Sequence, residues 1–459
     1  MDFMREDLLE KASVALGEAE AAGASQVEVE VFRFRNALTR LANSIIDQNV
    51  AENRITVRIL VYIGKKKGSY SLDSFFDADI KEAAKVAVRM AKVSAEDNDF
   101  ISLPEPRDSV SAITVDDMVC EATANATPEE RAEAARSIIQ MAHDFDKRVS
   151  AVSGAISTVL AEQVIINSLG VSAYQPNTIS NLNLTIIAKD GAEETAGWAS
   201  DNRMDFRELQ IEDVTERAVR KAAEGFQAID LGPGDYELIL EPAAVGGFMY
   251  FMMSTGFSAL NYQDYRSFLR DRIGEKVFSE QLTMWDDALD KRHYAPLLYD
   301  YEGFPKSRLE LVEAGTVKNL VYDSYTAGKD GVESTGHNAK VWGESMPYAS
   351  HIIIEDGDSS VTEMVEETKN GILVTHFHYQ NAVDPTKGML TGLTRDGAWL
   401  VKDGEIINPI KTVRYTDALP RFLANIDLVG RYHKLRDSQA IVPPLKLPSF
   451  RITGSRKQS

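Results

Sequence analysis

The stretch Gln26-Val-Glu-Val-Glu-Val-Phe-Arg-Phe-Arg35 repeats apolar and charged side chains with a period of two. Because successive side chains of a β-strand point to opposite faces, this pattern predicts a half-buried strand with one apolar and one polar face. A helix is expected just before it, over 5–22, where apolar residues recur at helical spacing until Gly23 ends the pattern. After this helix and strand, the sequence predicts further strands at 37–49 and 54–62 and an amphipathic helix at 77–93.

The same order of elements recurs further along the chain. A helix is predicted over 127–145, because Pro128 occupies its first position and acidic residues follow in its first turn, where negative charge favours the helix dipole. Strands are then expected at 149–160, 163–167, 172–174 and 181–189, followed by a turn and strand at 191–199 that match 64–71, and by a helix at 213–224. Residues 1–230 are therefore interpreted as a duplicated α-β-β-β-α domain whose two modules share a sheet or groove.

The segment Leu231-Gly-Pro-Gly-Asp235 marks a boundary between two domains, since glycine and proline in succession favour a turn. Residues 235–450 are rich in predicted strands, so a β-rich barrel or sandwich is expected for the second domain, and the fold class is α+β. The last two strands are joined by Lys402-Asp-Gly404, in which Asp-Gly favours a tight hairpin. The expected strands lie at 309–313, 316–322, 351–355, 371–379, 398–401 and 405–407.

The charge and the cysteine content exclude several classes of protein. The 459 residues carry a net charge of −20, and a surface this acidic repels nucleic acids and anionic membranes. We therefore expect no direct nucleic-acid partner and no membrane partner. The single cysteine, Cys120, excludes an internal disulfide and a cysteine-rich metal site. The N-terminus lacks the pattern of a signal peptide, and no apolar run approaches the roughly 18 residues that a membrane span needs. A cytoplasmic location is expected.

The segment after the predicted strand 236–240 contains no residue suited to catalysis. Pro242 stands near the first position of an expected helix, where its missing N–H is tolerated. From Pro242 to Met253 there is no His, Cys, Asp, Glu, Ser or Lys. Methionine and phenylalanine occur on every side of this helix, which predicts that it belongs to the core and is not a cofactor site.

His376-Phe-His378 is the one close pair of histidines. In a strand, residues i and i+2 share a face, so both imidazoles have the spacing to bind one metal ion. The sequence fixes no third ligand, and a stand-alone hydrolase would need a carboxylate such as Asp384. The alternative is a pair of hydrogen-bonded histidines on a sheet face or at a subunit contact. No HExxH, nucleotide-binding glycine loop or GxSxG motif accompanies them.

Two shorter segments allow both a functional and a structural interpretation. Ser334-Thr-Gly-His337 is either a binding loop or a turn whose polar side chains cap the backbone. Asp286-Asp287 is either a cation-binding pair or a pair of carboxylates in an exposed loop. The structural interpretation is favoured for both.

Several segments together resemble the TldD/PmbA family, whose members are also described as modulators of DNA gyrase. The resemblance spans nearly the whole chain and is most specific over 236–430, where the segments are strong in combination and weak alone. They are Leu240-Glu-Pro-Ala-Ala-Val245, Phe257-Ser-Ala259, Arg272-Ile-Gly-Glu275, Asp286-Asp287, Tyr325-Thr-Ala327, Ser334-Thr-Gly-His337, Asn381-Ala-Val-Asp-Pro385 with Gly388, and Gly404-Glu-Ile406.

The resemblance implies a peptidase scaffold that lacks catalytic residues. TldD-type members are similar to zinc peptidases and carry His-Glu-x-x-x-His on the corresponding helix, with a cysteine further on that completes the zinc site. Here Pro242 and Gly247 stand at the two histidine positions and Ala243 at the glutamate position. Cys120 lies in the wrong half of the chain to be the cysteine ligand. The pattern Leu-Glu-Pro-Ala-Ala-Val resembles the PmbA (TldE) branch instead.

Members of that branch resemble the non-catalytic partner in a TldD/TldE heterodimer, which acts on unfolded or flexible peptides. The resemblance therefore implies a peptide substrate, no cofactor in this chain, and zinc only in a TldD-like partner chain. Two alternatives remain open: a stand-alone metallo-hydrolase that uses His376 and His378, and a homodimeric peptide-binding regulator. An effect on gyrase would be indirect, through turnover of a peptide or protein inhibitor.

Overall fold

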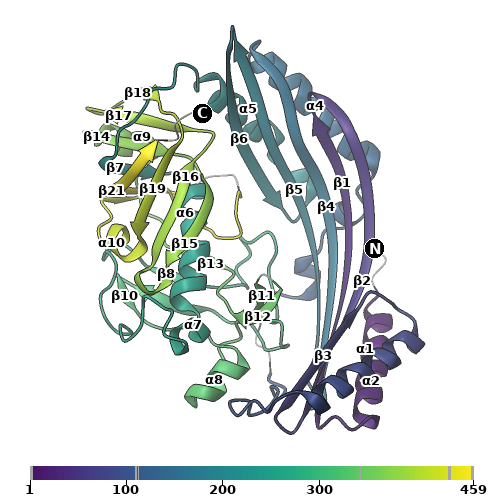
Figure 1. Ribbon diagram of the computed structural model, residues 1–459. Helices are drawn as coiled ribbons and strands as arrows, with labels where there is room; N and C mark the ends of the chain where they lie inside the picture. Colours follow the sequence, from purple (N-terminus) through teal and green to yellow (C-terminus); the bar gives the residue numbers. More distant parts are fainter. Residues whose placement is uncertain (1–3, 109–110, 112, 342, 433–435, 456–459) are drawn as a thin grey trace.

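The computed structural model describes residues 4–108, 111, 113–341, 343–432 and 436–455 (Figure 1). The N-terminal half forms a long curved sheet that carries helices, and the chain from residue 234 onward forms a second, β-rich part. This arrangement confirms the predicted α+β class. Within the described residues, no helix is long and apolar enough to cross a membrane.

The two N-terminal modules form one six-stranded antiparallel sheet with the order β3-β2-β1-β4-β5-β6, which confirms the duplication. The modules meet where β1 pairs with β4, with Glu28 opposite Asn167 and Leu41 opposite Gly154. The first module comprises α1 (Arg5–Ala21), β1 (Gln26–Ala42), β2 (Ile45–Ile63), β3 (Lys66–Leu72) and α2 (Asp77–Val93). After the short helices η1 (Val115–Met118) and α3 (Glu121–Ala124), the second comprises α4 (Pro128–Phe145), β4 (Val149–Asn167), β5 (Ser172–Asp190), β6 (Glu193–Arg203), η2 (Phe206–Glu208) and α5 (Ile211–Ala223).

One glycine in each module lets the last strand cross the last helix at close range. A Cβ atom at Gly68 of β3 would lie 2.2 Å from the carbonyl oxygen of Ala87 in α2. A Cβ atom at Gly197 of β6 would lie 2.1 Å from the carbonyl oxygen of Ala218 in α5. Neither position accepts a side chain unless the helix moves, so the repeat extends from the order of elements to single residues.

The helices cover the convex face of the sheet, and the second part of the chain lies on its concave side (Figure 1). On the convex face, α1 and α2 pack on a cluster that includes Val27 and Val29, while α4 and α5 pack on one that includes Val152 and Leu182. The N-terminal half therefore has two separate apolar cores under one continuous sheet.

The strand β1 is buried on both faces, so the prediction of a half-buried strand is wrong. Glu28 and Glu30 point away from the helices, yet they are only 9 % and 8 % exposed because the second part of the chain covers them. Up to Val31 the apolar residues of the strand are those that face the helices, whereas from Phe32 onward they are those on the opposite face. As a result, Phe32 and Phe34 share the concave face with the two glutamates.

Several predicted strand boundaries in the first half are also wrong. The strand expected at 37–49 contains a hairpin turn instead, because Asn43 and Ser44 have φ values of 50° and 61° and reverse the chain between β1 and β2. The breaks expected within 149–167 and 172–189 do not exist. Glu162 and Asn177, which fall in the expected breaks, are buried residues of a sheet whose two faces are both covered.

The second part contains a large mixed sheet with the order β15-β16-β19-β21-β7-β14-β17-β18, with β20 beside β21. A four-stranded sheet, β10-β9-β8-β13, and the pair β11-β12 complete it. Its strands are β7 (Gly234–Leu240), β8 (Met284–Asp286), β9 (Leu309–Glu313), β10 (Thr316–Val317), β11 (Asn338–Val341), β12 (Glu344–Pro347), β13 (Ile352–Ile354), β14 (Asn370–Val374), β15 (Phe377–Asp384), β16 (Met389–Thr394), β17 (Ala398–Lys402), β18 (Glu405–Pro409), β19 (Val413–Ala418), β20 (Leu428–Val429) and β21 (Leu445–Ser455). Its helices are α6 (Pro242–Met252), η3 (Met253–Phe257), α7 (Ala259–Gln263), α8 (Ser324–Asp330), α9 (Val361–Glu366), η4 (Pro385–Lys387) and α10 (Leu419–Leu423).

In this part of the chain, a strand prediction is confirmed where a tight turn sets the ends of the two strands that it joins. Asp403 and Gly404 have φ values of 46° and 83° and join β17 to β18, which confirms the predicted hairpin. The strand expected at 371–379 is wrong, because the chain leaves β14 in the middle of the sheet and enters β15 at its edge. The strand expected at 316–322 is reduced to the two residues of β10.

Candidate functional site

The strand β7 lies inside the large sheet of the second part, between β14 and β21. The helix α6 begins directly after this strand. Glu241 is the N-cap residue and Pro242 is the first helical residue. The prediction that this helix belongs to the core is confirmed, because Phe248, Met249 and Met252 are at most 1 % exposed.

The three positions that match the zinc motif of relatives lie close to other parts of the chain. Pro242 is buried, and Ala243 and Gly247 are half-buried. A Cβ atom at Gly247 would lie 2.5 Å from Oε1 of Gln380, whose Nε2 donates to the hydroxyl of Tyr415 at 2.8 Å. A histidine at position 247 would therefore require Gln380 to move, and the three residues present offer no metal ligand.

No metal-binding group is assembled elsewhere in the described residues, where no three His, Cys, Asp or Glu side chains are placed to share an ion. Cys120 precedes α3, which contacts β4 and β5 in the first half of the chain. Its backbone N–H donates to Oγ1 of Thr178 at 2.7 Å. The residues present thus do not fit a zinc site of the family pattern.

The two histidines near β15 lie in different surroundings. His376 occupies the break between β14 and β15, 4.6 Å from the ring of Trp198, and its Nε2 is 4.0 Å from Asp396. Burial, followed by the nearby charge of Lys221, lowers the pKa of His376 to about 3. His378 lies within β15 against the ring of Tyr379.

The carboxylate nominated with these histidines is engaged elsewhere. Asp384 lies six residues beyond His378, after two irregularities in the pairing of β15 with β16. It accepts a hydrogen bond from Oγ1 of Thr386 at 2.6 Å and pairs with Lys387 at 2.9 Å. His376, His378 and Asp384 therefore do not converge on one ion.

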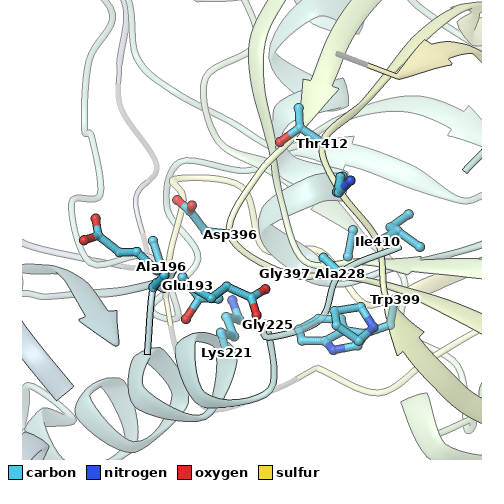
Figure 2. A pocket seen from close by; sticks show the side chains of 16 residues that line it. Glu193, Ala196, Lys221, Gly225, Ala228, Asp396, Gly397, Trp399, Ile410 and Thr412 are labelled. Atoms are coloured by element: carbon cyan, nitrogen blue, oxygen red, sulfur yellow. The ribbon is translucent and has the colours of Figure 1, made fainter. Parts of the chain in front are cut away.

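A buried ionic network joins the start of α6 to the first half of the chain. Glu241 forms an ion pair with Arg217 of α5, and Nζ of Lys221 lies 4.0 Å from the same carboxylate. Burial lowers the pKa of Lys221 to about 8, against the opposing effect of Glu241. Lys221 also lines an open cleft of about 820 Å³ between the two parts of the chain. Asp396 and Trp399 line the same cleft from the second part (Figure 2). This network fixes the position of α6 relative to the sheet.

A second cavity, which we call the groove, lies between the concave face of the sheet and the second part of the chain. It measures about 480 Å³ and is lined mainly by apolar side chains. The sheet contributes Phe32 and Phe34, and α6 contributes Tyr250 from its C-terminal turn. Two amide side chains of β5 hold its far wall: Gln175 accepts from the N–H groups of Leu298 and Tyr299, and Asn177 donates to the carbonyl of Pro296. An apolar groove with few polar groups suits an extended chain with apolar side chains.

Behind the groove lies a buried charged cluster. Nζ of Lys306 is 3.3 Å and Nε2 of His337 is 3.1 Å from Oδ1 of Asp286, and the N–H of His351 donates to its Oδ2 at 2.7 Å. Burial alone would raise the pKa of Asp286, but Lys306 and His337 outweigh it and hold this pKa well below its usual value. The cluster supports the wall of the groove that contains His351.

The structure tests the two interpretations that the sequence allowed for each of the shorter motifs. Asp286 is fully buried on β8, so both the cation-binding pair and the exposed loop are wrong for this residue. In the segment Ser334–His337, Oγ1 of Thr335 accepts from the N–H of Tyr322 at 2.8 Å, and Oγ of Ser334 donates to its carbonyl. The capping interpretation of this turn is therefore confirmed.

Three histidines with lowered pKa values predict a loss of stability in mild acid. Burial lowers the pKa of His293 to about 3, of His351 to about 4 and of His376 to about 3. Their pKa in the unfolded chain is about 6.5, so below this pH the unfolded state binds protons that the folded state does not. The free energy of unfolding should therefore fall by about 1.4 kcal/mol per histidine and pH unit between pH 6.5 and 4.

Urea denaturation at pH 7 and pH 5 measures this effect, and His351→Gln removes one of the three groups. Between these two pH values, the free energy of unfolding of the variant should fall by about 2 kcal/mol less than that of the parent protein. Equal losses in both proteins would contradict the assignment to His351.

The fold and the site together define a class of protein: a curved, duplicated antiparallel sheet over a β-rich domain, with an apolar groove between them. Two family models match the chain, the PmbA/TldA metallopeptidase central domain over residues 121–225 and the PmbA/TldA metallopeptidase C-terminal domain over residues 233–454. The chain belongs to the PmbA/TldA metallopeptidase family, as the resemblance to TldD and PmbA implied.

Relatives match over most of their length. The chain is 24 % identical to the metalloprotease PmbA homolog of Haemophilus influenzae, with 96 % of each chain covered. It is 25 % identical to metalloprotease MJ0996 of Methanocaldococcus jannaschii, over 83 % of this chain and 84 % of that one. The crystal structure of TldE from Thermococcus kodakarensis has the same fold, with a TM-score of 0.87 at 24 % identity over 97 % of this chain and 100 % of that chain.

Proposed function

We propose that this chain is a non-catalytic subunit of the PmbA/TldE type, which pairs with a zinc-bearing TldD-like chain in a metallopeptidase for unfolded or flexible peptides. The observation that carries the proposal is the state of α6. Pro242, Ala243 and Gly247 offer no ligand and no general base, and Gln380 fills the space beside Gly247. The same helix nevertheless ends at the groove through Tyr250, so the surface for a peptide is retained where the ligands are missing.

A free sheet edge supports association with a second chain. Among the described residues, the stretch Ile45–Ile55 of β2 pairs only with β1. The other neighbour, β3, pairs with β2 only from Val57 onward. Ile45 and Val50 on this stretch are 62 % and 46 % exposed. A long edge with unpaired backbone groups and apolar side chains is a template for another strand.

The test is to isolate this chain alone and with a co-expressed TldD-like chain that carries His-Glu-x-x-x-His. Metal analysis and hydrolysis of fluorescein-labelled casein, an unfolded protein, are measured on both samples. We expect far less than one zinc per chain and no turnover for the isolated chain, and stoichiometric zinc with turnover for the complex. Stoichiometric zinc and turnover by the isolated chain would overturn the proposal.

The same samples distinguish the two alternatives. A stand-alone metallo-hydrolase would lose its metal and its activity in the double variant His376→Ala, His378→Ala, whereas a non-catalytic subunit would be unaffected. A homodimeric peptide-binding regulator would sediment with twice the mass of one chain and recover no TldD-like chain in a pull-down. The cytoplasmic location stays a prediction from the sequence.

A further inference from the structure

A third cavity continues the concave face beyond the groove. It measures about 520 Å³ and lies between β1–β3 on one side and residues 302–345 of the second part on the other. Lys340 of β11 lines both this cavity and the groove, so the two are neighbours. On β1 the cavity is lined by Glu28, whereas the groove is lined by Phe32 and Phe34 of the same face.

Glu28 is a buried carboxylate without a partner. It is 9 % exposed, and among the described residues no hydrogen bond or ion pair reaches it. Glu30, the next residue on the same face, shows the usual alternative, since it pairs with Arg58 at 3.1 Å and accepts from Nε2 of Gln163 at 2.7 Å. Leaving a carboxylate buried and unpaired costs several kcal/mol if it is ionised, so Glu28 points to a missing cation.

Glu302 faces the same cavity from the opposite wall. Its Oε2 accepts from the N–H of Ser324 at 2.9 Å, and no other bond to its carboxylate occurs in the described part of the chain. The neighbouring acids differ from it, because Asp300 accepts three backbone N–H groups and Asp323 caps α8. Apart from the exposed Glu344, Glu28 and Glu302 are thus the carboxylates of this cavity with capacity for a ligand among the described residues.

Three positively charged residues line the cavity, Arg58, Lys67 and Lys340, and among the described residues none of them forms an ion pair with Glu28 or Glu302. Nζ of Lys340 donates to Oγ of Ser345 at 3.2 Å, and Arg58 is paired with Glu30. Burial, with Glu30 and Asp300, raises the pKa of Glu28 to about 7, although Lys340 and Lys67 act in the opposite direction. Burial and the acids Asp300, Asp323 and Glu28 raise the pKa of Glu302 well above its usual value.

The wall of the cavity also suits a cation. The rings of Tyr62 and Phe100 stack with their centroids 3.5 Å apart, and both residues line the cavity beside Glu28. The two residues are only 5 % and 6 % exposed, so they form a tightly packed apolar part of the wall. The site therefore combines two under-coordinated carboxylates with an apolar wall, which suits an organic cation that is carried on an aliphatic stem.

We propose that this cavity binds the cationic group of a peptide, either an amino-terminal ammonium or a basic side chain, while an apolar side chain of the same peptide occupies the groove. Glu28 and Phe32 are four residues apart on β1, which is about 13 Å in an extended strand. An extended peptide with its cation four residues before an aromatic side chain has the matching length. This inference deepens the proposed function and rests on its claim that the groove receives peptides.

The test measures binding to the full chain by calorimetry at pH 8 with three peptides of equal length. They are acetyl-Lys-Ala-Ala-Ala-Phe-Ala-amide, the same peptide with norleucine in place of lysine, and Ala-Ala-Ala-Ala-Phe-Ala-amide with a free amino terminus. We expect at least one of the two cationic peptides to bind about tenfold more tightly than the norleucine peptide. The lysine and amino-terminal arms show which source of positive charge the cavity prefers.

Two isosteric variants and a control locate the effect. Glu28→Gln and Glu302→Gln should each remove most of the tenfold preference and leave the affinity for the norleucine peptide within about twofold. Glu344→Gln, which removes an exposed carboxylate from the mouth of the same cavity, should preserve the preference. Circular dichroism confirms that each variant is folded.

The outcomes separate the two proposals. If all three peptides bind equally, or if Glu28→Gln and Glu302→Gln both keep the preference, the cation site is wrong and the groove stands. If none of the peptides binds, both the cation site and the peptide-binding role of the groove are wrong.

Discussion

Replacing Gly197 by alanine is expected to lower the free energy of unfolding by about 3 kcal/mol, at the upper end of the range for overpacked cores. The added methyl group would lie 2.1 Å from the carbonyl oxygen of Ala218 and 2.6 Å from the amide nitrogen of Ala222. Both are backbone atoms of α5, so no side-chain rotation relieves the contact. The helix must move away from β6, and the apolar core beneath it is opened.

Urea denaturation followed by circular dichroism measures this effect, and the repeat supplies an internal comparison. Gly68→Ala should cost a similar amount, since its Cβ would lie 2.2 Å from the carbonyl oxygen of Ala87. Gly17→Ala is the matched control, because nothing lies within 4 Å of its Cβ position in the exposed face of α1. This control should gain about 0.5–1 kcal/mol. Equal effects at Gly197 and Gly17 would contradict the close crossing.

Replacing Lys306 by methionine is expected to destabilise the second part of the chain by about 3–5 kcal/mol, the range for breaking a buried ion pair. The side chains of Lys306 and Asp286 are 2 % and 0 % exposed, and Nζ of Lys306 also donates to the carbonyl of Gly336. Methionine fills a similar volume, so the loss comes from the charge left on Asp286 and from the unsatisfied carbonyl.

Thermal unfolding and urea denaturation of this variant are compared with those of Lys318→Met. Lys318 pairs with Glu313 at 2.7 Å, but the two side chains are 41 % and 64 % exposed. Its removal should therefore cost at most about 1 kcal/mol. The double variant Asp286→Asn, Lys306→Met should be more stable than Lys306→Met alone, since it removes the uncompensated charge. A loss at Lys306 no larger than at Lys318 would contradict the role of the cluster.

Local patterns predicted the order of elements in the first half well, but not their lengths. The helix at 77–93 and the turn at Asp403-Gly404 match the structure because amphipathic spacing and positive φ are properties of short segments. The hairpin at Asn43-Ser44 was missed, since neither residue is a glycine. The continuous strands β4 and β5 were divided because their polar residues are covered by a part of the chain that is remote in sequence.

The site was predictable only where one helix carries it. The absence of any ligand from Pro242 to Met253 is visible in the sequence, and it remains the strongest functional feature of the chain. The groove and the cation site were not predicted, because they bring β1 next to residues about 270 positions later. One signal was present: the change of the apolar side at Val31-Phe32 indicates a strand with two covered faces.

The seam between β1 and β4 has a consequence for how the molecule assembles. Equivalent strands of the two modules pair antiparallel there, which is the geometry of two identical subunits related by a two-fold axis. Because one chain carries both modules, this pairing does not depend on protein concentration: the connection gives each module an effective local concentration of its counterpart in the millimolar range. The curved sheet thus has the arrangement of a symmetric dimer held within a single polypeptide.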